Sequence, residues 1–442
     1  DEIKQLKSEK ELNEKKQSEE ISKINNNNLI LKQQLDNLLT QIEQLKKDIK
    51  SKNEMNQINS NDNEDKKEDN SNNQVLQSKS DSSSTVDFDL FRSSSRLLNT
   101  FYGHVNIVYS IDYSTFDGGQ YICSSSWDNT VCVWDIDNKK QIQSFNGHLD
   151  RVYRVKFSPY HYQNSHRNII CSSSHDNTIR FWNVKNNEQL QIFNEHNDWV
   201  GGVEFSPFNG GRYLFSGSGD KTIRIWDVET YKSLHVFNGH EGGVWCMNIS
   251  PLQSNNNNND DNKSNSIGVI GGNGYTICSG SFDKTIRIWD IETAKQSITF
   301  KGHQGVVRSV KYGPNELRNI ILSGAEENTI RLWDIRSGEQ TQVFNGHTHW
   351  VWDVEYPPFV IKNGNETVGN VICSGSIDST IRFWDIRSNK KELHLIKGGD
   401  RVFSVGFVPL KKKINNNEQR PANDVAVHLC GGLGNGLLHI WG

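Results

Sequence analysis

Hydrophobic residues are scarce in this sequence, and it has neither a long apolar run nor an excess of basic charge. Only 34% of its 442 residues are hydrophobic, which is low for a chain that folds along its whole length. No apolar stretch approaches the roughly 18 to 20 residues of a membrane-spanning helix. The formal net charge of −4 argues against nucleic acid or an anionic membrane as the main partner. The first residue is Asp1 rather than Met, which predicts a fragment or a processed form.

Proline and glycine are absent from residues 1–55, which favours a helix. Within this stretch residues 21–49 have the clearest heptads. Their a positions are Ile21, Asn28, Leu35, Ile42 and Ile49, and their d positions are Ile24, Leu31, Leu38 and Leu45. β-branched residues mostly at a, Leu mostly at d and one Asn in the core predict a parallel homodimeric coiled coil. The alternative is a single solvated helix.

Apolar side chains are nearly absent from residues 56–95, which are rich in Asn, Ser and Asp. Such a segment cannot bury enough surface to offset the entropy of ordering it. We therefore expect a disordered linker here, with an r.m.s. span of roughly 35 Å.

From about residue 96 to the end the sequence repeats itself. Histidine, in most copies after glycine, recurs at His104, His148, His196, His240, His303 and His347. Tryptophan recurs at Trp134, Trp182, Trp226, Trp289, Trp333, Trp384 and Trp441. Each of the first five of these Trp residues precedes the next His by 14 residues. Each copy holds several short stretches rich in Val, Ile, Phe and Tyr, and the stretch "TIRIWD" alternates apolar and polar residues as a strand does. Four strands per copy of about 44 residues predict one blade of a β-propeller.

These residues carry a resemblance. The pattern "GH … SGSGDKTIRIWD" resembles the WD40 repeat family, and it recurs seven times between residues 96 and 442. The resemblance implies an all-β, seven-bladed propeller for this domain.

The resemblance also implies a hydrogen-bonded set of His, Ser, Asp and Trp within each blade. The first three blades supply His104, Ser124, Asp128, Trp134; His148, Ser172, Asp176, Trp182; and His196, Ser216, Asp220, Trp226. The fourth and sixth supply His240, Ser279, Asp283, Trp289 and His347, Ser374, Asp378, Trp384. The fifth has His303, Ser323 and Trp333. Such sets superficially resemble a hydrolase triad, but several copies in register indicate blade stabilisation, so no enzyme activity is expected.

Two blades depart from the His, Ser, Asp and Trp set, while the second has Asn183 after its Trp and the third has Glu195 in place of Gly. In the fifth, Glu327 stands in the place of the Asp, which predicts a looser hydrogen-bonded set. In the seventh, Gly398 and Gly399 replace Gly-His and Asn435 replaces the Asp, so this blade is expected to have the least internal stabilisation.

Five of the seven cysteines lie five residues before the turn acid or its equivalent, where Phe215 and Leu322 stand in other copies. A position that accepts Cys, Phe or Leu is an apolar core position, so neither a metal site nor a cofactor is expected. Cysteines without a pairing pattern indicate a reducing compartment, which predicts the cytoplasm, with the nucleus as an alternative.

Insertions are confined to the turn between the first and second strands of a copy, so they extend one face and leave the opposite face clear. They comprise residues 250–274, residues 356–369 and residues 409–424, and their Asn-rich sequence predicts disorder. On the clear face the resemblance places residues three and five after each His at the rim of the central channel. We take as the partner-binding rim Tyr109, Arg151, Tyr153, Trp199, Trp245, Arg308, Trp350, Trp352, Arg401 and Phe403. Tyr, Trp and Arg are enriched at binding hot spots. The alternative is that the Trp residues pack between blades, although Gly201 and Gly243 are expected to leave room beside them.

The last copy stops at its Trp, while residues 96–101 have a fourth-strand pattern with no blade before them. We therefore expect Leu97 to Phe101 to pair beside Leu437 to Trp441 and close the ring.

Together these features predict a noncatalytic scaffold that dimerises through its coiled coil and binds proteins or peptides on the face carrying the His and Asp turns. Neither a nucleic acid partner nor a membrane span is expected. The alternative is a substrate receptor of a cullin-type ubiquitin ligase. It rests on "WDIR" ending at Arg336 and Arg387, which resembles the WDxR box of such receptors, and on the rim arginines as readers of a phosphorylated peptide.

Overall fold

The computed structural model describes residues 86–116, 119–250, 275–314, 317–363, 366–387, 392–411 and 425–442. All of them belong to one compact unit, Asp81–Gly442. The predicted coiled coil and most of the predicted linker lie outside the described residues, as do residues 251–274 and 412–424 of two predicted insertions.

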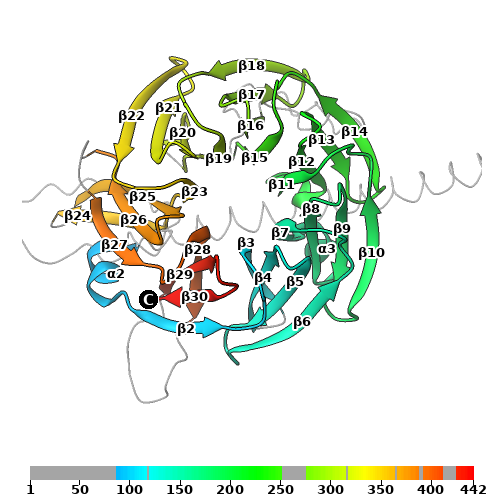
Figure 1. Ribbon diagram of the computed structural model, residues 1–442, viewed down its shortest axis with the longest axis horizontal. Helices are drawn as coiled ribbons and strands as arrows, with labels where there is room; N and C mark the ends of the chain where they lie inside the picture. The colour runs from blue at the N-terminus through cyan, green and yellow to red at the C-terminus, as the bar shows by residue number, and fades with distance from the viewer. Residues whose placement is uncertain are drawn as a thin grey trace, which may run out of the picture. The chain divides into compact units, whose positions relative to one another are not determined.

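Seven sheets stand around a ring, and each forms one blade (Figure 1). Blade 1 contains β3 (Val108–Phe116), β4 (Gly119–Ser126), β5 (Thr130–Asp135) and β6 (Lys140–Asn146). Blade 2 contains β7 (Val152–Phe157), β8 (Ile169–Ser174), β9 (Ile179–Asn183) and β10 (Glu188–Phe193), with α3 (Pro159–Ser165) after β7. Blade 3 contains β11 (Val200–Phe205), β12 (Tyr213–Ser218), β13 (Ile223–Asp227) and β14 (Lys232–Phe237), with the short helix η1 (Asn209–Gly211) after β11.

The remaining blades follow the same order from the channel outward. Blade 4 contains β15 (Val244–Ile249), β16 (Thr276–Ser281), β17 (Ile286–Asp290) and β18 (Lys295–Phe300). Blade 5 contains β19 (Val307–Tyr312), β20 (Ile320–Ala325), β21 (Thr329–Asp334) and β22 (Glu339–Asn345). Blade 6 contains β23 (Val351–Glu355), β25 (Glu366–Ser376), β26 (Thr380–Asp385) and β27 (Glu392–Lys397). Blade 7 contains β28 (Val402–Lys411), β29 (Val425–Leu433) and β30 (Leu438–Trp441). The prediction of an all-β, seven-bladed propeller is confirmed.

Alternation along the strands explains how the blades pack. In β13, Ile223 and Ile225 are fully buried, while Arg224 between them is partly exposed. The buried side chains of one blade meet those of the next, so the apolar core lies between blades; Phe145 of blade 1, for example, clusters with Val155 and Trp182 of blade 2. Each blade thus covers one face of its neighbour, which is how repeat units that cannot bury their own apolar faces become stable.

The outermost strand of blade 7 comes from the other end of the described chain. β2 (Leu97–Phe101) pairs antiparallel with β30, with Leu97 opposite Trp441 and Phe101 opposite Leu438. Two further backbone hydrogen bonds join Arg96 to Gly442. In Figure 1 the blue β2 and the red β30 lie side by side. This pairing closes the ring and covers the outer edge of β30.

Blade 6 carries an addition that corrects two expectations. Residues 356–369 were expected to form a disordered loop, but they include β24 (Phe359–Asn363), which pairs with β25. The linker was expected to continue to residue 95, but β1 (Val86–Asp87) pairs parallel with β24, and α2 (Phe88–Ser94) follows it. The reason is two aromatic side chains in an otherwise polar stretch: Phe88 and Phe91 are buried against Phe359 and Phe383.

Candidate functional site

The six His residues of the repeat each anchor a chain of hydrogen bonds. In blade 2, Trp182 Nε1 donates to Ser172 Oγ at 2.8 Å, Ser172 Oγ lies 2.8 Å from His148 Nε2, and His148 Nδ1 lies 2.8 Å from Asp176 Oδ2. Because the Ser hydroxyl accepts from Trp, we assign its proton to His Nε2, which leaves Nδ1–H to donate to the carboxylate. The corresponding Nδ1–carboxylate distances in the other five blades are 2.7 to 3.0 Å.

The turn acid ties two loops together on one face of the ring, which we call the His face. Asp176 also accepts a hydrogen bond from the backbone N–H of Leu149, the residue after His148, at 2.9 Å. Equivalent bonds reach Val105, Asn197, Glu241 and Thr348. Burial opposes ionisation of Asp176, but its hydrogen bond to His148 and further hydrogen bonds lower its pKa well below the ordinary value. The loops of this face are therefore held in fixed positions.

The fifth blade keeps this set despite its longer acid. Glu327 Oε1 lies 2.8 Å from His303 Nδ1, and His303 Nε2 lies 2.7 Å from Ser323 Oγ. Glu327 also accepts from Arg331 Nε at 2.9 Å. The expectation of a looser set is therefore wrong. The distances within the set match those of the other blades, and Glu327 lies 2.8 Å from Arg331, whereas the equivalent acid–arginine distances in blades 2, 4 and 6 are 3.5 to 3.9 Å.

Blade 7 has glycine where the others have the serine of the set. Gly431 stands ten residues before Trp441, and a Cβ at Gly431 would lie 2.9 Å from the Trp441 ring. The Trp441 ring therefore occupies the space of the missing side chain. Asn435 accepts a hydrogen bond only from the backbone of Leu437 among the bonds within the described residues.

Five of the predicted rim residues fill the channel instead of standing beside it. Tyr109, Tyr153, Trp245, Trp352 and Phe403 are 3–7% exposed, and we call them the aromatic plug. Their rings touch across the axis, with centroid distances of 4.9 Å between Tyr153 and Trp245, 5.9 Å between Trp245 and Trp352, and 4.8 Å between Trp352 and Phe403. The plug comes from blades 1, 2, 4, 6 and 7.

Arg308 of blade 5 completes the plug. Its guanidinium lies 4.4 Å from the centroid of Trp245 and 4.5 Å from that of Trp352, and Nε donates to Glu326 at 2.9 Å. Arg308 is 8% exposed. Its charge is therefore already paired with Glu326 and stacked between two aromatic rings.

Trp199 occupies the room that the glycines of blades 3 and 4 provide. A Cβ at Gly201, Gly219 or Gly243 would come within 2.5 to 2.8 Å of its ring. The space that the sequence predicted beside the aromatics is thus filled by Trp199 itself, which contacts Trp245 at 5.5 Å between centroids.

The remaining predicted rim residues lie around the plug and reach solvent. Trp350 is 37% exposed and stacks on Trp352. The side chains of Arg151 and Arg401 are 36% and 48% exposed and lie on different blades.

Comparing the copies at one further sequence position would have predicted more of the side chains on the His face. The residue before each turn acid is Trp127 in blade 1 and Phe282 in blade 4. The Arg151 guanidinium lies 4.1 Å from the Trp127 centroid, and Phe282 is 38% exposed. Val105 and Leu149, each directly after a His, are 87% and 82% exposed. We call Trp127, Trp199, Phe282 and Trp350 the outer ring.

The described residues hold no group of three or more His, Cys, Asp or Glu side chains arranged to bind a metal ion. All seven cysteines are buried and free, and burial raises the pKa of Cys123, Cys171, Cys246, Cys278, Cys373 and Cys430. Among the helices of the described ranges none has the length and hydropathy to cross a bilayer.

Comparison with known proteins gives one extensive match. The family model described as "WD domain, G-beta repeat" matches residues 95–135, 139–183, 187–227, 231–290, 294–334 and 338–385. Those stretches contain the first six repeat tryptophans and end before blade 7, whose departures from the repeat pattern are the largest.

Individual relatives match over much shorter stretches. The human "Peroxisomal targeting signal 2 receptor" is 38% identical over 63 residues, which are 14% of this chain and 20% of the receptor. The mouse protein of the same name matches with the same identity and coverage. The "Superkiller complex protein 8" of Dictyostelium discoideum is 34% identical over 67 residues, 15% of this chain and 22% of that protein. The matched stretch thus spans about a fifth of each of these relatives.

Proposed function

The chain belongs to the WD40-repeat family, and we propose that it is a noncatalytic scaffold that binds a protein or peptide partner on the His face. Proteins of this family generally mediate protein interactions. The observation that supports the face is the outer ring: four aromatic side chains around a filled channel, on loops that the turn acids hold in place. Phe282 and Trp350 are exposed, and Trp127 and Trp199 are partly buried. Aromatic side chains on fixed loops bind with a small loss of conformational entropy.

The aromatic plug closes the channel beneath the proposed site with tightly packed side chains. A partner side chain cannot enter the channel from this face without displacing Trp245 or Trp352, so recognition takes place over the outer ring. Trp245 Nε1 is buried and has no hydrogen-bond partner among the described residues. A buried donor without an acceptor lowers stability.

We further propose that the protein is a homodimer through residues 21–49 and that it acts in the cytoplasm, with the nucleus as an alternative. A dimer would present two His faces. After one face has bound a partner, binding at the second face is intramolecular, so two weak contacts give a higher overall affinity. The matched relatives include, by name, a receptor and a protein of a complex, which is compatible with a binding role.

The test is affinity capture with the full chain as bait. We expect Trp350→Ala plus Phe282→Ala to reduce the recovery of specific partners about tenfold or more, since hot-spot residues contribute about 2 kcal/mol or more. Leu234→Ala is the matched control, because Leu234 is 41% exposed on the outer strand β14. Equal recovery by the folded double variant and the control would reject the His face as the binding site.

The ubiquitin-ligase alternative receives less support from the geometry. Arg336 and Arg387 are exposed at the turns after β21 and β26. Arg308, however, is buried and paired with Glu326, so it is not available to bind a phosphate. Arg151 and Arg401 alone would have to read the phosphorylated peptide.

A further inference from the structure

A cavity of about 730 Å³ lies in the channel on the side of the plug away from the His face. None of the plug rings lines it, whereas Tyr356, Pro357 and Pro358, which follow the far end of β23, do. The cavity therefore faces the side of the insertions. A pocket of this size is in the range that holds small ligands.

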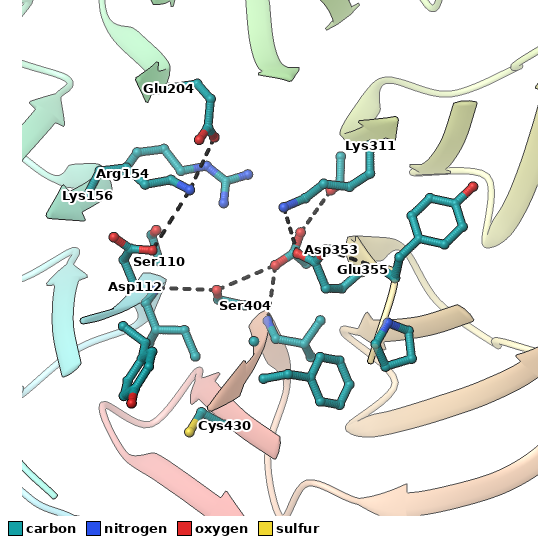
Figure 2. Close-up of a pocket in the computed structure, with 18 of the residues that line it drawn as sticks. Ser110, Asp112, Arg154, Lys156, Glu204, Lys311, Asp353, Glu355, Ser404 and Cys430 are labelled. Carbon is teal, nitrogen blue, oxygen red and sulfur yellow. Dashed lines mark hydrogen bonds and ion pairs between the residues drawn. The ribbon is translucent and has the colours of Figure 1, made fainter. Parts of the chain in front are cut away.

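The innermost strands supply two layers of side chains to this cavity. One layer lies two residues after the first valine of each strand and includes Arg154 and Asp353. The next layer lies four residues after that valine and includes Asp112, Lys156, Glu204, Lys311 and Glu355. The lining thus carries three cations and four carboxylates, and Figure 2 shows them pointing toward one another.

The carboxylates and the two lysines are satisfied by one another or by nearby donors. Lys156 Nζ lies 3.1 Å from Glu204 and 3.9 Å from Asp112. Lys311 pairs with Glu355 at 2.6 Å. Asp353 accepts from Ser309 Oγ at 2.8 Å and from the backbone N–H of Val405 at 3.0 Å.

Arg154 is the exception. It reaches into the cavity from β7, and Figure 2 shows no dashed line from its guanidinium to the other residues drawn. No hydrogen bond or ion pair of its guanidinium is found among the described residues. A guanidinium does not lose its proton in a protein, and its planar fork matches a carboxylate or a phosphate. The one unpaired cation of the described lining is therefore aimed at the open volume.

The part of the wall that blade 7 contributes is largely apolar because one side chain is missing. In the layer that holds Asp112 and Lys156, blade 7 has Gly406, and Phe407, Val408 and Val427 also line the cavity. A Cβ at Gly406 would meet Ile111 only at ordinary contact distance, 3.5 Å. The uncovered wall suits an apolar group extending away from Arg154.

We propose that this cavity binds a carboxylate with a short apolar body, the carboxylate on Arg154 and the body against the wall beside Gly406. Arg154 is the one cation of the described lining without a partner, so it can pair with a single carboxylate. A phosphate dianion would place a second charge among four carboxylates and is disfavoured by repulsion. The same carboxylate chemistry is found in a free aliphatic acid and in the C-terminus of a peptide ending in an apolar residue.

Ligand-observed saturation-transfer NMR on the full chain tests the proposal, with hexanoate as probe and hexanamide as its neutral counterpart. We expect hexanoate to bind and hexanamide to bind at least tenfold more weakly. Arg154→Gln should weaken hexanoate tenfold or more. Arg167→Gln is the matched control, because Arg167 is exposed outside the cavity. Equal binding of acid and amide, or unchanged binding by Arg154→Gln, would overturn the proposal.

A second variant removes the volume and keeps the charge. Gly406→Leu fills the cavity beside the apolar wall and should abolish hexanoate binding, while Gly406→Ala should retain it. Retained binding by a folded Gly406→Leu variant would contradict the proposed position. A tetrapeptide ending in leucine, free or amidated at its C-terminus, then distinguishes the sources. If only the peptide with the free C-terminus competes with hexanoate, the ligand is a peptide C-terminus. If neither peptide competes, the ligand is a free aliphatic acid.

Discussion

His148 and Asp176 illustrate what a single pair contributes to this molecule. Burial lowers the pKa of His148, as it does for His240 and His303, even though each faces an acid. The acids of these three pairs have lowered pKa values as well, through hydrogen bonds that favour the charged carboxylate. A neutral His that donates a hydrogen bond to an ionised carboxylate is consistent with the lowered pKa of the His and with the lowered pKa of the acid. His104 differs, because hydrogen bonds to Asp128 and Cys132 outweigh burial and raise its pKa to about 9.

These directions predict how stability depends on pH. A lowered pKa in the folded state means that the unfolded chain takes up the proton first, so stability is lost as pH falls. The histidine contribution should decline below about pH 6.5 and the carboxylate contribution below about pH 4. His104 acts in the opposite sense and loses its contribution between about pH 6.5 and its folded pKa of about 9. Thermal unfolding of the full chain from pH 3 to 9 should therefore show a falling midpoint below neutrality.

Asp176→Asn isolates one carboxylate. It should cost about 1–3 kcal/mol at pH 7, because His148 loses a charged acceptor, and it should flatten the decline below pH 4. Asp89→Asn is the control, since Asp89 is 56% exposed and, within the part of the chain that the structure describes, its side chain forms an ion pair only with Arg92 in α2. A pH profile of Asp176→Asn parallel to that of the wild type would show that the pair does not carry the acid response.

At the scale of elements, closure depends on one short strand. β2 contributes backbone hydrogen bonds to β30 and the buried side chain of Phe101, which packs on Trp134 of blade 1 at 5.5 Å between centroids. Without it, β30 would be an open edge, and blade 1 would lose part of its apolar cover. Blade 7 has little to compensate, because Gly431, Gly399 and Asn435 replace members of its internal set.

Deletion of residues 96–101 should therefore lower the thermal midpoint by several degrees and expose an aggregation-prone edge. Deletion of the six residues 60–65 is the length-matched control and should leave the midpoint unchanged. Differential scanning calorimetry and light scattering measure both effects. Equal midpoints for the two deletions would show that closure by β2 contributes little to stability.

The proposed homodimer combines one coiled coil with two propellers, one from each chain. If residues 21–49 form the dimer, the full chain should sediment at twice the chain mass at micromolar concentrations, and a chain beginning at residue 81 should sediment as a monomer. The bounds of the compact unit at Asp81 make this truncation a suitable comparison. Analytical ultracentrifugation distinguishes the two states, and a monomeric full chain would refute the dimer and the avidity that depends on it.

Much of the fold could be predicted from the sequence because each copy has the same local pattern of residues. Strands such as "TIRIWD" alternate apolar and polar residues, and the turn acid follows the second strand of each copy. Trp182 and its equivalents recur at equal distances from the next His. Local patterns of period two, repeated seven times, leave a propeller as the architecture that buries every apolar face. The all-β class and the number of copies followed from that repetition, and the family followed from the resemblance of the repeated motif.

Only the tertiary structure decided what each rim and channel residue does. Trp245, Trp350 and Trp352 stand at equivalent or neighbouring positions of the copies, yet the first and last are buried in the plug and Trp350 is 37% exposed. Arg154 and Arg308 are both channel arginines, but one is unpaired within the described residues and the other stacks between two rings. These differences arise where seven non-identical blades meet at one axis. The side chains there contact partners hundreds of residues away, which no local pattern specifies, whereas the strands themselves are specified by their own neighbours in sequence.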